Sequence, residues 1–232
     1  MNDVVYILKK GIDPYELTYS LRSVEANFPH GKIIFAGAKP EGITPDIQIV
    51  HEQRGPDRYA KVCTTIREIC SDDRVSDQFW LFNDDFFIMQ PIDDLPQMTG
   101  GTLWHHIQRL EKKYGTSHYI QNLRKTAQEL KRKGYDRLDY ALHVPMLIDK
   151  EKAIATLDKF DSPMFRTVYG NHHRVGGVVS DDVKIHSVKE VPSEDCVLLS
   201  TTDEAFRDGR VGEYIRGIFG TPSKYELDRI GG

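Results

Sequence analysis

The chain has 232 residues, of which 39% are hydrophobic, and a net charge of −4. It is long enough to bury a sizeable core, and its composition is that of an ordinary globular protein. It contains no apolar run that could span a bilayer and no charged-then-apolar leader, and its acidity argues against a generic nucleic-acid binder. We therefore expect a cytoplasmic protein without membrane insertion. No obligate protein partner is evident, and three cysteines without a matching pair fit a reducing compartment.

The first ninety residues alternate between strand and helix patterns. Apolar runs predict strands over 3–8, 32–37, 47–50 and 79–82, and helical spacing predicts helices over 15–27 and 58–70. This order predicts an α/β fold with a mainly parallel sheet flanked by helices, as in nucleotide-binding half-domains. Neither GxGxxG nor GxxxxGK[ST] is present, so phosphate would be held by a metal ion and basic side chains.

The predicted strand over 79–82 leads directly into Asn83, Asp84 and Asp85, and a second apolar run follows over 86–88. A buried carboxylate must be paired or hold a metal, and the carboxyl ends of parallel strands are where such sheets bind ligands. Carboxylate oxygens suit Mg²⁺ or Mn²⁺. The pattern therefore predicts a divalent-cation site, and the alternative is an exposed Asn-Asp-Asp turn.

Positive charge is concentrated in the segment 105–137, which has nine Lys or Arg against three acids. Its net charge is therefore +6, which leaves −10 for the remainder. The spacing predicts two helices broken at Gly115 and Thr116, preceded by a loop and a short strand over 95–104. We interpret 105–137 as a basic helical insertion, within a single domain over 1–232, that meets an anionic partner. A solvated helical surface is the alternative.

The last hundred residues contain a second acid pair. A strand is predicted over 140–148, a helix from its cap Asp149 through Phe160, a strand over 196–200 ended by a turn at 201–203, and a helix over 212–219. Between them lie a polar stretch over 164–174 and the pair Asp181 and Asp182, flanked by apolar residues.

Several segments together resemble the Stealth-type sugar-phosphate transferases and related glycosyltransferases of the GT-A fold. The resemblance follows the chain order through 3–6 with 11–14, 17–27, 82–87, 143–145 with 165–166, and 222–226. Two family blocks depart: 55–61 replaces the segment usual before the central helix, and the Asn-Asp-rich fourth block survives only as 202–204. The acceptor and the bond made therefore stay open.

The resemblance implies a GT-A-like fold, a UDP-sugar donor and a Mn²⁺ or Mg²⁺ cofactor. The reaction would be sugar transfer to an acceptor hydroxyl, either of a saccharide or of a hydroxymethylated base in DNA. One alternative is transfer of sugar-1-phosphate to a saccharide. Another is a non-catalytic nucleotide-sugar-binding protein.

Candidate site residues follow from these expectations. Asp85 would be the direct metal ligand, Asp84 would contact metal-bound water or the donor sugar, and His186 would be a further ligand. A late carboxylate, Asp181 or Asp182, would be the general base. The expected nucleotide-sugar contacts are Arg22, Lys61, Asn83, Asp84 and Arg166. The expected acceptor contacts are Arg124, Lys131, Arg132, Lys133, His143, His172 and Arg174.

Overall fold

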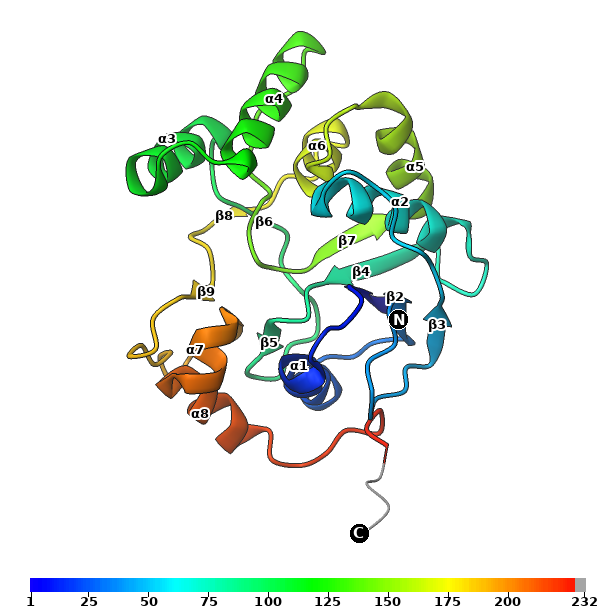
Figure 1. Cartoon of the computed structure of the whole chain (residues 1–232), viewed down its shortest axis with the longest axis vertical. Helices are drawn as coiled ribbons and strands as arrows, with labels where there is room; N and C mark the ends of the chain where they lie inside the picture. Colours follow the sequence, from blue (N-terminus) through cyan, green and yellow to red (C-terminus); the bar gives the residue numbers. More distant parts are fainter. Residues whose placement is uncertain (228–232) are drawn as a thin grey trace.

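The computed structural model describes residues 1–227, and its centre is a five-stranded sheet in the order β3-β2-β1-β4-β7 (Figure 1). These strands are β1 Asp3–Leu8, β2 Ile33–Gly37, β3 Ile47–Ile49, β4 Gln78–Phe82 and β7 Met146–Asp149. The first four run parallel to one another, and β7 is antiparallel to β4. The expectation of a mainly parallel α/β sheet is confirmed.

Helices cover both faces of the sheet because the strands are apolar on both sides. Along β1, Val4 and Tyr6 pack under helix α1 Pro14–Asn27, and Val5 packs toward the opposite face. That face is covered by α2 Arg58–Ser71, α5 Lys150–Lys159 and α6 Phe165–His172. The sequence predicts helices over the regions of α1, α2 and α5, and Asp13, Asp57 and Asp149 cap these three. Helix α6 is not among the predicted helices, because the sequence pattern over 164–174 indicates only a polar segment.

A smaller three-stranded sheet lies beside α1 (Figure 1). It contains β5 Phe86–Ile88, β9 Lys184–Ile185 and β10 Leu198–Thr201, and it packs against α7 Asp203–Asp208 and α8 Arg210–Ile218. Two side chains of α1 complete the free edge of β5: Ser20 Oγ donates to the Phe86 carbonyl, and Ser23 Oγ accepts from Ile88 N–H. This packing fixes the chain immediately after Asp85.

The chain between β5 and β7 forms a helical excursion. It contains β6 Met98–Thr99, paired with β8 Val178–Val179, and then α3 Leu103–Tyr114 and α4 His118–Arg132. The two helices break where the sequence predicted. The expected short strand is β6, but Trp104 belongs to α3, because Thr102 accepts a bond from His105 N–H and starts the helix.

Two predicted elements are wrong in part. The strand predicted over 140–148 begins only at Met146, because the preceding backbone groups bond to side chains instead of a strand: His143 N–H to Asp182, and the Leu142 and Val144 carbonyls to Arg166. The late strand, predicted to end at 201–203, includes Thr201, and helix α7 follows it directly because Thr202 Oγ accepts from Ala205 N–H. Within residues 1–227, no helix is long and apolar enough to cross a membrane.

Candidate functional site

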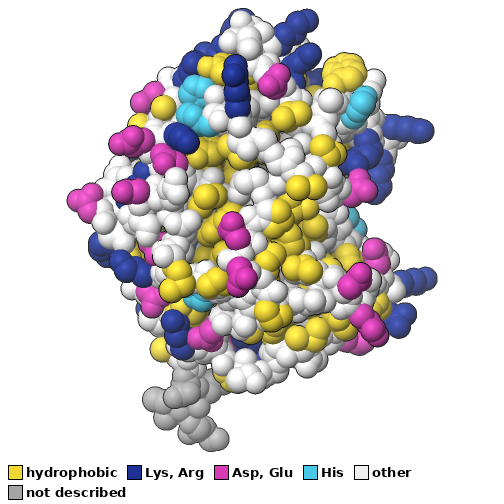
Figure 2. Space-filling view, turned by 180° about the vertical axis from the view of Figure 1, so that it is seen from behind, with side chains coloured by type: hydrophobic (Ala, Val, Ile, Leu, Met, Phe, Trp, Pro, Cys, Tyr) yellow, Lys and Arg dark blue, Asp and Glu magenta, His cyan; other side chains and the backbone are white. Residues whose placement is uncertain are grey.

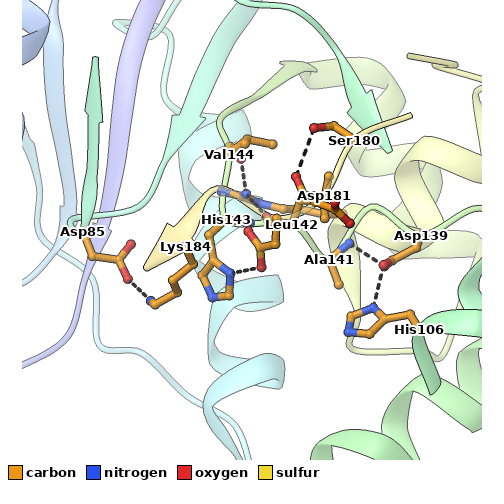
Figure 3. A network of polar contacts seen from close by, with 12 residues as sticks. Asp85, His106, Asp139, Ala141, Leu142, His143, Val144, Ser180, Asp181 and Lys184 are labelled. Atoms are coloured by element: carbon orange, nitrogen blue, oxygen red, sulfur yellow. Dashed lines mark hydrogen bonds and ion pairs between the residues drawn. The ribbon is translucent and has the colours of Figure 1, made fainter. Parts of the chain in front are cut away.

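Asn83, Asp84 and Asp85 follow β4 at the carboxyl edge of the parallel strands, as predicted. All three are half-buried. Asp85 Oδ2 pairs with the Lys184 ammonium from β9, and the two side chains are 19% and 11% exposed (Figure 3). Asp85 Oδ1 is buried without a hydrogen-bond partner in the described chain. A buried oxygen left open at a strand end is the kind of exception that marks a ligand site.

Glu16, in the first turn of α1, is a site residue that the sequence did not single out. Its carboxylate accepts a 2.6 Å bond from Thr201 Oγ, and the Thr201 N–H donates to the Asp85 carbonyl. Burial, followed by the charges of Asp85 and Asp84, raises the pKa of Glu16 to about 7. Burial and Asp85 likewise raise the pKa of Asp84. An acid in a helix's first turn is common, so its sequence position carried no signal.

A second polar pair joins His143 to Asp182. His143 Nδ1 lies 2.7 Å from Asp182 Oδ2, and the His143 N–H donates to Asp182 Oδ1 at 3.0 Å (Figure 3). Burial raises the pKa of Asp182, but the bonds from His143 hold it below its ordinary value. Asp181 is exposed, and its backbone carbonyl accepts from Ser180 Oγ. Of the two acids predicted as bases, the structure therefore engages Asp182, through an imidazole.

Arg166 has a different role from the one expected. Its guanidinium donates to the carbonyls of Leu81, Leu142 and Val144, and to the Asn83 side chain. Burial lowers its pKa to about 10, so the group stays charged at neutral pH. Because these hydrogen bonds occupy its two terminal nitrogens, Arg166 holds the end of β4 and the 142–144 loop in place. Those nitrogens are therefore not free to bind the phosphate of a nucleotide sugar.

A buried pair that the sequence analysis missed supports the same loop. His106 Nδ1 on α3 lies 2.5 Å from Asp139 Oδ2, although the contact lacks hydrogen-bond geometry (Figure 3). Asp139 Oδ1 accepts from Ala141 N–H at 2.9 Å. These contacts join the helical excursion to the loop that carries His143.

Two adjoining cavities lie at this edge of the sheet, and together we call them the strand-end cleft. The first, of about 480 Å³, is lined by Asn83, Asp84, His143, Arg166, Tyr59 and Tyr119. The second, of about 650 Å³, is lined by Lys9, Lys10, Arg58 and Lys61, beside the ends of β1 and β2. Ile7, Arg58 and Val62 line both. Lys61, predicted for the nucleotide, lies in the basic half of the cleft.

Other predicted site residues lie elsewhere. Arg22 donates to both carboxylate oxygens of Glu226 and to the Phe219 carbonyl, so it ties α1 to the end of the chain. His172 packs against His173 near Thr156, and burial lowers its pKa to about 4. Neither residue lines the strand-end cleft, which corrects both expectations.

His186 and Arg174 are both exposed, and within residues 1–227 neither side chain has a hydrogen-bond or ion-pair partner. The pKa of His186 is lowered by burial and then by Lys184, His143 and Lys113. No group of three metal-ligating side chains forms within residues 1–227, and His186 does not join the aspartates in one.

On the basic surface of α3 and α4, some Lys and Arg side chains bind protein groups and others are exposed without an ion pair to the described part of the chain. Arg124 pairs with Glu111, and Lys133 donates to the Lys159 carbonyl. Lys125, Lys131 and Arg132 are exposed, with no ion pair to any residue in 1–227. Lys and Arg side chains stand out at the top of the view in Figure 2, the end where α3 and α4 lie, while hydrophobic side chains occupy the middle of that face.

No family model matches the chain, and no curated protein matches it.

Proposed function

We propose that the chain is a nucleotide-sugar-dependent glycosyltransferase of the GT-A type that works with a divalent cation. The observation that carries the proposal is the strand-end cleft, in which Asp84 and Asn83 line one cavity and lysines line the adjoining one. In an activated sugar the diphosphate lies between the nucleoside and the reacting carbon, so one donor would contact both cavities of the cleft. Binding at the carboxyl ends of parallel strands is typical of α/β sheets.

The basic half suits the nucleotide diphosphate. Lys9, Lys10, Arg58 and Lys61 supply side-chain cations at the ends of β1 and β2 and at the start of α2. The chain has no glycine-rich phosphate loop, so these charges would have to do the work that backbone N–H groups do elsewhere.

The residues near Asp85 fit a magnesium or manganese ion by their chemistry. Asp85 has a buried carboxylate oxygen without a partner in residues 1–227, and burial, with a smaller contribution from neighbouring carboxylates, raises the pKa values of Asp84 and Glu16. Such ions use one or two carboxylates together with substrate phosphates, so a closed protein cage is not required. When bound, the ion would neutralise charge on the departing diphosphate. Asp85 and Asp84 would hold it.

His143 and Asp182 form a general-base pair. Asp182 holds the proton on His143 Nδ1, which leaves Nε2 as the acceptor on the wall of the cavity. As the acceptor oxygen bonds to the anomeric carbon, its proton passes to Nε2, and the bond from carbon to the diphosphate oxygen breaks with the electron pair leaving on the diphosphate. The proposed base is therefore the imidazole of His143, which Asp182 orients, and not an aspartate carboxylate as the sequence predicted.

The free cations of α3 and α4 favour an anionic acceptor. Tyr119 of α4 lines the cavity beside Asp84 and stacks on Tyr59, with ring centroids 5.9 Å apart. An acceptor that lies along α4 therefore reaches the site past an aromatic pair. A hydroxymethylated base in DNA meets both conditions, because it would bring a phosphate backbone and a flipped ring. A charged saccharide would bring the negative charge but not the flipped ring.

The test offers UDP-sugars with Mn²⁺ to the wild-type protein and to Asp85→Ala, with saccharide and modified-DNA acceptors. We expect UDP release that falls at least about a hundredfold in the variant. Asp73→Ala, an exposed acid at the opposite edge of the sheet, is the matched control and should keep full activity.

Undiminished turnover by Asp85→Ala would reject the assignment. Release of UMP, with phosphorus in the product, would identify sugar-1-phosphate transfer. UDP binding without turnover of any donor would identify the non-catalytic alternative.

A further inference from the structure

Lys184 occupies an unusual position for a lysine. Its side chain is 11% exposed, and its ammonium contacts Asp85 Oδ2, at the point where the proposed function needs a divalent cation (Figure 3). It comes from β9, a two-residue strand at the edge of the small sheet, more than ninety residues after Asp85 in sequence. The Lys184 ammonium has no assigned role in the proposed transfer reaction.

Charge balance explains why the ammonium is there. Asp84, Asp85 and Glu16 crowd the carboxyl edge of β4, and within residues 1–227 Lys184 is the cation in contact with Asp85. Without a counter-charge, a largely buried carboxylate is strongly unfavourable. Lys184 therefore supplies the counter-charge to Asp85 and holds its carboxylate in place when no other cation is bound. It leaves the second oxygen of Asp85 open.

We propose that Lys184 is an exchangeable internal counter-ion: it holds Asp85 in the empty site, gives way when a divalent cation binds, and then serves the donor diphosphate. The inference rests on the proposed function. An ammonium and a divalent cation on the two oxygens of one half-buried carboxylate repel each other, which favours exchange over sharing. A lysine suits the exchange, because its compact charge sits on a flexible four-carbon stem.

Exchange has a thermodynamic consequence. Cation binding must first break the Lys184–Asp85 pair, so the wild-type protein binds the ion alone more weakly than a chain without the ammonium. The diphosphate offsets the free energy lost with the Lys184–Asp85 pair, because it binds the released ammonium. The device therefore makes the cation and the nucleotide bind as a coupled pair, by a coupling of about tenfold.

The first experiment uses the wild-type chain and reads no activity. Its lysines are labelled with an amine-reactive reagent, with and without saturating Mn²⁺, and quantified by mass spectrometry. We expect Lys184 to be protected in the metal-free protein and its labelling to rise about tenfold with Mn²⁺, because the freed ammonium turns toward the cleft. Exposed Lys189 is the control for the reactivity of the reagent, and its labelling should be the same with and without Mn²⁺. Equal labelling of Lys184 in both states, while Mn²⁺ binds, would overturn the exchange.

The second experiment measures Mn²⁺ affinity by calorimetry for wild type, Lys184→Met and the control Lys189→Met, each with and without UDP. We expect Lys184→Met to bind Mn²⁺ alone about tenfold tighter, and to lose most of the tightening that UDP adds beyond its own affinity for Mn²⁺. Lys189→Met should match wild type. If Lys184→Met does not fold, the labelling experiment decides alone.

The outcomes separate the two proposals. Equal Mn²⁺ affinity in wild type and Lys184→Met overturns the exchange and leaves the proposed transferase standing. Absence of Mn²⁺ binding in every variant overturns both the exchange and the metal part of the proposed function. UDP-sugar turnover would then show whether transfer itself survives.

Discussion

At the scale of single residues, two acids at neighbouring strands differ in whether their carboxylate oxygens have hydrogen-bond partners. Asp3, in β1, is 3% exposed, and its carboxylate accepts bonds from Lys32 N–H and from both the N–H and the hydroxyl of Ser76. It is satisfied and joins segments at the amino edge of the sheet. Asp85, at the carboxyl edge, has one oxygen with Lys184 and one with no partner in residues 1–227. The acid with the open oxygen therefore lies at the edge where we propose that the ligand binds.

Glu16 predicts a pH dependence of stability. Its pKa is raised from 4.5 to about 7 in the folded chain, so the folded state holds this proton more tightly than the unfolded state between those values. Stability from this group is therefore full below pH 4.5 and declines as the pH rises toward 7. With a chelator present, Glu16→Gln should raise the melting temperature by a few degrees at pH 8 and leave it unchanged at pH 4.5. An equal shift at both pH values would contradict this account.

The base pair predicts a kinetic signature. Asp182→Asn should lower kcat by about a hundredfold, because an amide can no longer hold the proton on His143 Nδ1. The donor KM should change little, since Asp182 does not line the strand-end cleft. Asp181→Asn is the matched control on the neighbouring exposed acid and should be near wild type. A larger loss in Asp181→Asn than in Asp182→Asn would restore the exposed acid as the base.

At the scale of elements, arginines join segments that are far apart in the chain. Arg166 of α6 binds the end of β4 and the 142–144 loop, and Arg22 of α1 binds Glu226 and the Phe219 carbonyl. A guanidinium suits this role because its donors are fixed in a planar fork. The sequence predicted both residues as nucleotide-sugar contacts, but in the structure their guanidinium groups donate to protein atoms.

Arg22 accordingly predicts a stability effect. Its side chain is 13% exposed and that of Glu226 is 17% exposed. Arg22→Met should lower the free energy of unfolding by about 2 kcal/mol, less than for a fully buried pair because water still screens this one. Arg74→Met should cost little, because the Arg74 side chain, which pairs with Asp72, is 57% exposed. Chemical denaturation measures both, and UDP affinity should be unchanged in Arg22→Met. A weakened UDP affinity in a stable variant would return Arg22 to the site.

At the scale of the whole molecule, charge is unevenly distributed along the chain. The chain is −4 overall, yet the segment 105–137 is +6 and its exposed cations lie on α3 and α4 (Figure 2). A protein with this division repels polyanions over most of its surface and attracts them at one end. The field would therefore orient an anionic acceptor before it contacts the cleft.

This arrangement predicts salt-dependent DNA binding. Reversing Lys131 and Arg132 to Glu should weaken affinity for duplex DNA and flatten the slope of log affinity against log salt, because fewer counterions are released. Reversing Lys189 and Lys224, both exposed, is the charge-matched control. Fluorescence anisotropy at several salt concentrations measures both. An absence of DNA affinity at low salt would remove DNA as the acceptor and leave a saccharide.

The sequence by itself determined the four parallel strands, helices α1, α2 and α5, and the position of Asn83, Asp84 and Asp85, because these follow from local patterns and from where an apolar run stops. The tertiary structure alone decided which side chains meet. Lys184 reaches Asp85 and Asp182 reaches His143 across 99 and 39 residues, and Glu16 joins the acids through Thr201. Such pairings depend on how layers pack, which no local pattern encodes. For the same reason, the loop before Met146 had strand composition but gave its backbone bonds to side chains instead.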